Sequence, residues 1–112
     1  MNVVVIEAHH ASFPNPIKIK KGESVQVGKR DTEFVGWIWT TTHDGNSGWA
    51  PESLLEISGE HAVAKEDYIA SELSTEVGEE LTVFRELHAW YWVSNSAGVY
   101  GWVPVKTVTK VL

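Results

Sequence analysis

Hydrophobic and polar residues alternate along most of this chain in short runs, with the period of two that is typical of β-strands. The alternation places Val25 and Val27 on one side of such a run, and Leu81 and Val83 on one side of another. Turn residues separate the runs, and helical spacing is almost absent. We therefore predict an all-β protein made of short antiparallel strands.

The strand pattern occurs twice. Residues 21–27 (KGESVQV) match 77–83 (VGEELTV) at an offset of 56, whereas residues 37–51 match 90–104 at an offset of 53, so the first copy has three extra residues between its two blocks. Each copy predicts about five strands, the content of a small antiparallel barrel. We expect two tandem five-stranded antiparallel barrels, residues 1–58 and 59–112, joined by a short connection at about residues 57–62.

The composition limits the chemistry and the cellular location that we expect for the protein. The 112 residues include no cysteine, which excludes disulfides, thiolate metal sites and a cysteine nucleophile. The sequence has no apparent secretion signal and no apolar run of membrane-spanning length, so a cytoplasmic location is expected.

Charge narrows the choice of partners. Nine basic and fifteen acidic residues give a net charge of −6, and both predicted barrels are acidic. Negative charge repels phosphate backbones and anionic lipid headgroups. We therefore expect no nucleic-acid or membrane partner, and favour a basic or neutral one.

Six tryptophans are more than two small barrels can enclose, so several indoles are expected at or near the surface. Trp37 and Trp90 are the stronger candidates for ligand contact, since a rigid ring with an N–H donor is typical of interaction hot spots. For Trp49 and Trp102, ligand contact and packing where the two barrels meet are equally compatible with the sequence.

Each copy contains a tryptophan, Trp37 or Trp90, followed by a Gly-Trp-x-Pro run at residues 48–51 or 101–104. With this order of motifs both copies resemble Src-homology-3 (SH3) domains, and the pair resembles bacterial variant SH3 proteins. In the second copy, residues 64–68 (AKEDY) stand where the family has Ala-Leu-Tyr-Asp-Tyr, Trp90 stands at the first tryptophan of its Trp-Trp pair, and residues 101–104 (GWVP) stand at its Gly-aromatic-x-Pro strand. The first copy keeps GWAP at 48–51 but has AHH at 8–10. The resemblance implies two tandem SH3-like barrels.

The resemblance also implies an aromatic groove that holds proline-rich peptides as a polyproline II helix. The positions that correspond to the family's groove are Tyr68, Trp90 and Pro104 in the second copy and His10, Trp37 and Pro51 in the first, with Glu72 in the loop beside the second groove. The tyrosine that follows the family's proline by three residues falls on Thr107 and Leu54.

No pattern of residues points to catalysis. The chain has no nucleophile elbow, phosphate-binding glycine loop or clear carboxylate pair. The neighbours His9 and His10 would point to opposite faces of a strand, which does not suit a shared metal ion. We expect a non-enzymatic protein without a metal or cofactor.

Two hypotheses for function follow. The first is a protein-interaction module that binds an extended, proline-rich or basic peptide segment through tryptophan-lined grooves. The alternative is a structural or oligomerising protein whose aromatic faces are used in contacts between barrels or subunits. The sequence leaves the oligomeric state open.

Overall fold

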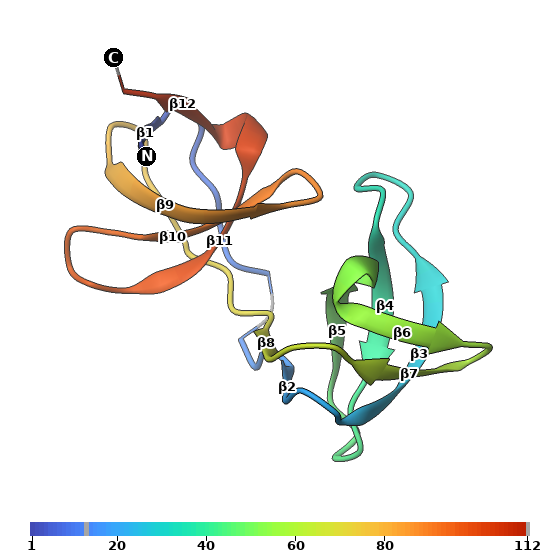
Figure 1. Cartoon of the computed structure of the whole chain (residues 1–112). Helices are drawn as coiled ribbons and strands as arrows, with labels where there is room; N and C mark the ends of the chain where they lie inside the picture. Colours follow the sequence, from blue (N-terminus) through green and yellow to red (C-terminus); the bar gives the residue numbers. More distant parts are fainter. Residues whose placement is uncertain (13, 112) are drawn as a thin grey trace. The chain divides into compact units, whose positions relative to one another are not determined.

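The computed structural model describes residues 1–12 and 14–111, which form strands, turns and two three-residue 3-10 helices. Figure 1 shows the strands, which make two five-stranded antiparallel sheets and one two-stranded ladder. The predicted all-β fold class is confirmed. No helix in the described part of the chain is long and apolar enough to cross a membrane.

The strands belong to two compact units. Unit 1 consists of Met1–Pro14 and Ser71–Leu112, and unit 2 consists of Asn15–Ala70. This division differs from the expected one at residue 58, because each unit contains strands from both sequence copies.

Unit 1 holds the first strand of the chain and the last four. In order along the sequence, its elements are β1 (Asn2–Val5), β9 (Glu80–Leu87), β10 (Trp90–Ser94), β11 (Tyr100–Pro104), the 3-10 helix η2 (Val105–Thr107) and β12 (Val108–Lys110). The sheet order is β11-β10-β9-β1-β12. Strand β1 of the first copy therefore lies between two strands of the second.

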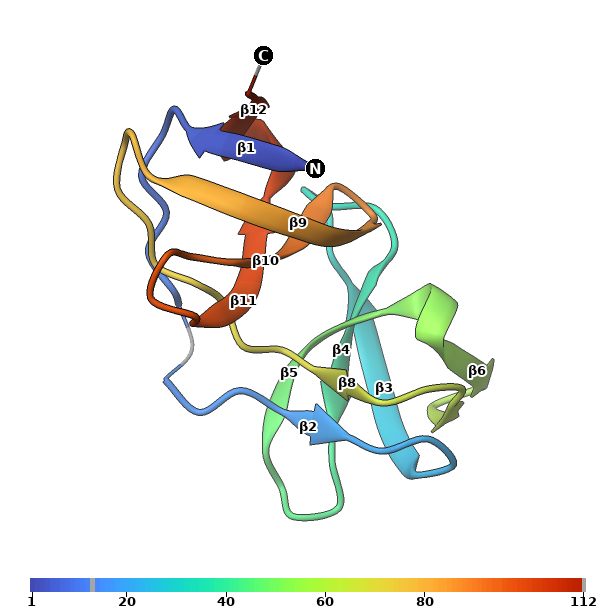
Figure 2. The same ribbon diagram turned by 60° about the vertical axis from the view of Figure 1, so that its left-hand side comes forward.

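Unit 2 holds the intervening strands. Its elements are β2 (Lys18–Ile19), β3 (Ser24–Arg30), β4 (Trp37–Thr41), β5 (Ser47–Pro51), the 3-10 helix η1 (Glu52–Leu54), β6 (Leu55–Ser58), β7 (His61–Ala64) and β8 (Tyr68–Ile69). The five-stranded sheet has the order β5-β4-β3-β7-β6, and β2 pairs with β8. Here β7 of the second copy lies between β3 and β6 of the first, just as β1 lies between β9 and β12 in unit 1 (Figure 2).

Strands β1 and β7 are equivalent and have exchanged places. Val3 of β1 lies opposite Leu81, and Ala62 of β7 lies opposite Val25, the residue that matches Leu81 in the repeat. The pairings with β12 and β6 correspond in the same way. Each copy thus contributes its N-terminal segment, residues 1–14 or 59–70, to the unit that contains the rest of the other copy, and the first strands β1 and β7 pair in the same register.

A two-residue turn accounts for the exchange. Strand β6 ends at Ser58 and β7 begins at His61, and Gly59 between them has a φ of +62°. Glycine with positive φ at the first position of a two-residue loop is typical of tight hairpins. The short connection near residues 57–62 is therefore a hairpin turn within unit 2, and the chain passes between the units after residues 14 and 70.

The period-two pattern correctly predicted the buried face for Val25, Val27 and Leu81, whereas Val83 is only partly buried and Trp37, expected at the surface, is buried beside Ile38. In unit 1 the inward-facing side chains form one core cluster, whose members are Val3, Val5, Leu73, Leu81, Tyr91, Val93, Val103 and Val108. In unit 2 the buried residues include Ile17, Ile19, Val25, Val27, Ile38, Ala62 and Ala64. The exchanged strands β1 and β7 thus supply two core residues each.

Candidate functional site

The exchange of first strands redistributes the predicted site residues. Trp90, Pro104 and Glu72 lie in unit 1, as expected of residues from one copy. Tyr68, however, follows β7 into unit 2, where it joins Trp37 and Pro51. The expected grouping of Tyr68 with Trp90 and Pro104 is therefore corrected, because β7 carries the tyrosine away from its own copy.

The place of this tyrosine in unit 1 is taken by His9. His9 pairs with Thr75 across an antiparallel bridge, as Tyr68 pairs with Ile19, the residue that matches Thr75 in the repeat. His10 is exposed, one residue beyond this position. The sequence comparison had shifted the first strand by one residue, and such a shift exchanges the two faces of a strand.

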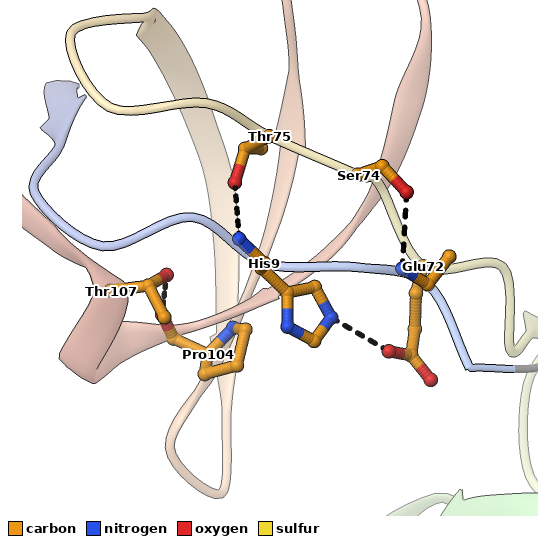
Figure 3. Close-up of polar contacts among 7 residues, drawn as sticks. His9, Glu72, Ser74, Thr75, Pro104 and Thr107 are labelled. Atoms are coloured by element: carbon orange, nitrogen blue, oxygen red, sulfur yellow. Dashed lines mark hydrogen bonds and ion pairs between the residues drawn. The ribbon is translucent and has the colours of Figure 1, made fainter.

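His9 is fixed by bonds to the second copy (Figure 3). Its imidazole Nε2 lies 2.7 Å from Oε1 of Glu72, with the two side chains only 16% and 15% exposed. The backbone N–H of His9 donates to the Thr75 hydroxyl over 3.2 Å, and its carbonyl accepts from the Thr75 N–H over 2.8 Å. The Ala11 N–H donates to the Ser74 hydroxyl. The segments 9–11 and 72–75 are thus joined.

Trp90 and Pro104 complete the arrangement. They lie opposite each other on β10 and β11, and the rings of His9 and Trp90 meet edge to face with their centroids 5.5 Å apart. Trp90 is half-buried, whereas Pro104 is buried. We call His9, Glu72, Trp90 and Pro104 the composite cluster, because the first comes from one sequence copy and the others from the second.

The corresponding residues of unit 2 offer less surface. Tyr68 is 9% exposed and Trp37 5%, while Pro51 is fully buried. The Tyr68 hydroxyl donates to the Trp49 carbonyl over 2.9 Å. These three residues contribute mainly to the packing of unit 2.

The family has a further tyrosine three residues after the proline, and the residue at this position is buried in each unit. Thr107 is 3% exposed and donates its hydroxyl proton to the Pro104 carbonyl over 2.7 Å. Leu54 is 4% exposed. Neither residue extends an aromatic surface beyond the proline.

The loops that precede the two tryptophans differ in length. Residues 31–36 connect β3 to β4 before Trp37, whereas only His88 and Ala89 connect β9 to β10 before Trp90. The predicted extra residues of the first copy therefore lie in this loop. His88 and Ala89 have φ values of 44° and 72°, which are typical of a tight two-residue turn, and Trp90 follows this turn directly.

Both units are acidic. Unit 1 has three basic and six acidic residues, and unit 2 has six and nine, so each carries a net charge of −3. In residues 1–12 and 14–111, no group of three or more His, Asp or Glu side chains is placed to hold a metal ion. The composite cluster can therefore offer a partner part of the Trp90 indole and a carboxylate engaged by an imidazole, whereas its proline is buried.

A second group of aromatic side chains in unit 1 was not predicted. Phe84 is 56% exposed and Tyr100 51%; the two rings lie next to each other, and Tyr100 also lies next to Trp92 of β10. The corresponding residues of the first copy are Gly28 and Ser47, at the repeat offsets of 56 and 53. A position-by-position comparison of the copies would have shown this difference.

Two small antiparallel units, each with a tryptophan opposite a proline on neighbouring strands, define a tandem SH3-like protein. A family model of the variant SH3 domain matches residues 3–58 and again 61–111. No curated protein and no solved structure matches the chain significantly. The chain belongs to the variant SH3 domain family, whose domains are generally protein-interaction modules without catalytic activity.

Proposed function

We propose that unit 1 binds an extended, proline-containing and basic peptide segment of a partner protein at the composite cluster. The observation that carries the proposal is the half-buried Trp90 beside Pro104 and His9, with the Glu72 carboxylate close by. A proline-rich segment fits a partly exposed tryptophan because the segment is already extended and loses little entropy on binding.

Charge favours a basic ligand. Unit 1 has a net charge of −3, and Glu72 is the acidic residue within the cluster. Its carboxylate is bonded to His9, so an arginine or lysine of the ligand has to share or displace the imidazole. Opposite charge at the edge of a site increases the association rate and selects among partners.

Unit 2 is proposed to act mainly as a support. Its equivalent residues Trp37, Tyr68 and Pro51 are almost wholly buried, and a ligand has little of them to contact. The unequal exposure of Trp90 and Trp37 is the specific reason for assigning binding to unit 1.

A tryptophan-fluorescence titration with a pool of basic, proline-rich peptides tests this proposal. We expect a saturable shift with the wild-type chain that is lost in Trp90→Ala and weakened in Glu72→Gln. Trp39→Ala is the matched control, because Trp39 is a half-buried tryptophan of unit 2. Full binding by Trp90→Ala would refute the assignment to the composite cluster.

The alternative proposal is a structural or oligomerising protein. The observation in its favour is the exposure of large apolar side chains, among them Val35 at 85% and Val77 at 67%. Sedimentation velocity over a wide concentration range separates the two proposals. Association at micromolar concentration, reversed by charged substitutions at these valines, would favour the structural role.

A further inference from the structure

The second aromatic group of unit 1 forms a continuous surface on β9, β10 and β11. The Phe84 and Tyr100 rings have their centroids 5.6 Å apart, and Tyr100 stacks on Trp92 at 6.1 Å with an interplanar angle of 26°. Trp92 in turn contacts Trp102, which is buried. We call Phe84, Trp92 and Tyr100 the aromatic platform.

The two outermost rings are not needed for the fold. Unit 2 builds the same strands with Gly28 at the position of Phe84 and Ser47 at the position of Tyr100. Both aromatic side chains remain more than half exposed, so they gain little from burial in their own unit. Their presence therefore points to a contact outside the unit.

The equivalent surface of unit 2 indicates which kind of ligand the aromatic platform would bind. The Lys29 ammonium lies 5.9 Å from the centroid of the Trp39 ring and 6.0 Å from that of the Trp49 ring. Cations are attracted to aromatic faces at this distance by the ring quadrupole. In unit 1, Arg85 occupies the position of Lys29 opposite Trp92, and the platform extends beyond it through Tyr100 and Phe84.

The size of the platform limits its occupant. At 56% and 51% exposure, the Phe84 and Tyr100 side chains present roughly 200 Å² together, given about 200 Å² for a whole aromatic side chain. A stable interface between two copies of a chain buries about 800 Å² per partner. The platform is therefore the size of one side chain and too small to hold two copies together.

We propose that the aromatic platform binds an arginine side chain of a partner protein. A guanidinium is planar, stacks on aromatic faces and is less strongly hydrated than an ammonium, so it suits the near-parallel Tyr100 and Trp92 rings better than lysine does. The net charge of −3 on unit 1 attracts it. This site is distinct from the composite cluster and does not depend on the proposed function.

NMR on the intact chain tests the proposal, with a blocked peptide of alternating glycine and arginine as the probe. We expect the aromatic resonances of Phe84 and Tyr100 to shift saturably. The same peptide with citrulline, a neutral isostere of arginine, should cause no such shift, and the lysine peptide should bind more weakly. The double variant Phe84→Gly, Tyr100→Ser places the residues of unit 2 in unit 1, and should reduce affinity about fivefold.

Trp90→Ala separates this site from the composite cluster. Platform shifts that persist in Trp90→Ala show the two sites to be independent, whichever way the test of the composite cluster turns out. Equal shifts with the citrulline peptide, or undiminished binding by the double variant, would overturn the proposal. Platform resonances that move with protein concentration alone would also overturn it, in favour of self-association.

Discussion

His9 and Glu72 are 63 residues apart in the sequence, yet the imidazole Nε2 and the carboxylate Oε1 are separated by 2.7 Å. The contact joins the first sequence copy to the second inside unit 1. It follows directly from the exchange of β1 and β7, because His9 comes four residues after the end of β1. The composite cluster therefore exists only in a chain whose first strands are exchanged.

Engineered cysteines test the exchange. Asn2 lies opposite Thr82, and the Val83 N–H donates to the Met1 carbonyl, which makes Asn2–Thr82 the closer, non-hydrogen-bonded type of pair. We expect Asn2→Cys, Thr82→Cys to form an intramolecular disulfide in this cysteine-free chain. Non-reducing mass spectrometry of the monomer detects the loss of two hydrogens.

The matched control is Asn2→Cys with Gln26→Cys. Gln26 is the residue of β3 that corresponds to Thr82, and in the structure its partner is His61. Without exchange, Asn2 would lie opposite Gln26. Efficient oxidation of this second pair, with failure of the first, would contradict the exchanged arrangement.

A substitution at Gly101 tests how closely the segment that contains Glu72 must approach β11. A Cβ at residue 101 would lie 2.7 Å from the Leu73 nitrogen and 2.9 Å from the Glu72 carbonyl carbon, so backbone has to move. We expect Gly101→Ala to lower the free energy of unfolding by about 1–3 kcal/mol. Chemical denaturation measures the loss, and chemical shifts at Glu72 and His9 report the displacement.

The equivalent substitution in unit 2 serves as the comparison. A Cβ at Gly48 would meet only the Ile17 side chain, at 3.3 Å, and a side chain adjusts more easily than backbone. Gly48→Ala should therefore cost clearly less than Gly101→Ala. Equal costs would mean that the approach of Leu73 to β11 is looser than described.

Asp44 gives the turn between β4 and β5 a pH dependence. The Thr42 hydroxyl and the Asn46 N–H donate to its carboxylate, and the Thr42 bond is the main reason that the pKa of Asp44 lies below its ordinary value of 3.8. The folded state then binds its proton less readily than the unfolded state. The stabilisation is complete above the unfolded-state pKa and is lost as the pH falls through the folded-state pKa.

The carboxyl titration of Asp44, followed by NMR, measures this directly. Its midpoint should lie below 3.8 in the wild type and move up in Thr42→Val, which lacks the donor hydroxyl. Asp44→Asn should destabilise the protein near neutral pH, and the difference from wild type should shrink in strong acid. A wild-type midpoint at or above the ordinary value would contradict the assignment.

The strands and their faces were predictable because period-two alternation follows from local geometry, as the burial of Val25 and Leu81 illustrates. The exchange was not predicted, because β1 and β7 pair in the same register and either satisfies the same neighbours. What decides between them is the two-residue turn at Gly59, whose tightness keeps β7 beside β6. The turn at Gly59 could be recognised from the sequence, but its effect on which strand pairs in which unit was not predicted.

The site was predictable in part. Trp90 and Pro104 lie opposite each other, and His9 contacts both Trp90 and Glu72, so these three residues of the second copy lie in one unit. Tyr68 was assigned to the wrong neighbours because it follows the exchanged strand β7 into unit 2, and His10 was chosen in place of His9 because of a one-residue shift. Aligning the alternating pairs Val3, Val5 and Ala62, Ala64 corrects that shift.

The most direct test of the central claim is a backbone NMR titration of the full chain with a basic, proline-rich peptide that binds it. The account predicts saturable shifts in both copies at once, around His9 in the first and around Glu72, Trp90 and Pro104 in the second. Shifts centred instead on Trp37, Pro51 and Tyr68 would contradict it, because binding would then belong to unit 2.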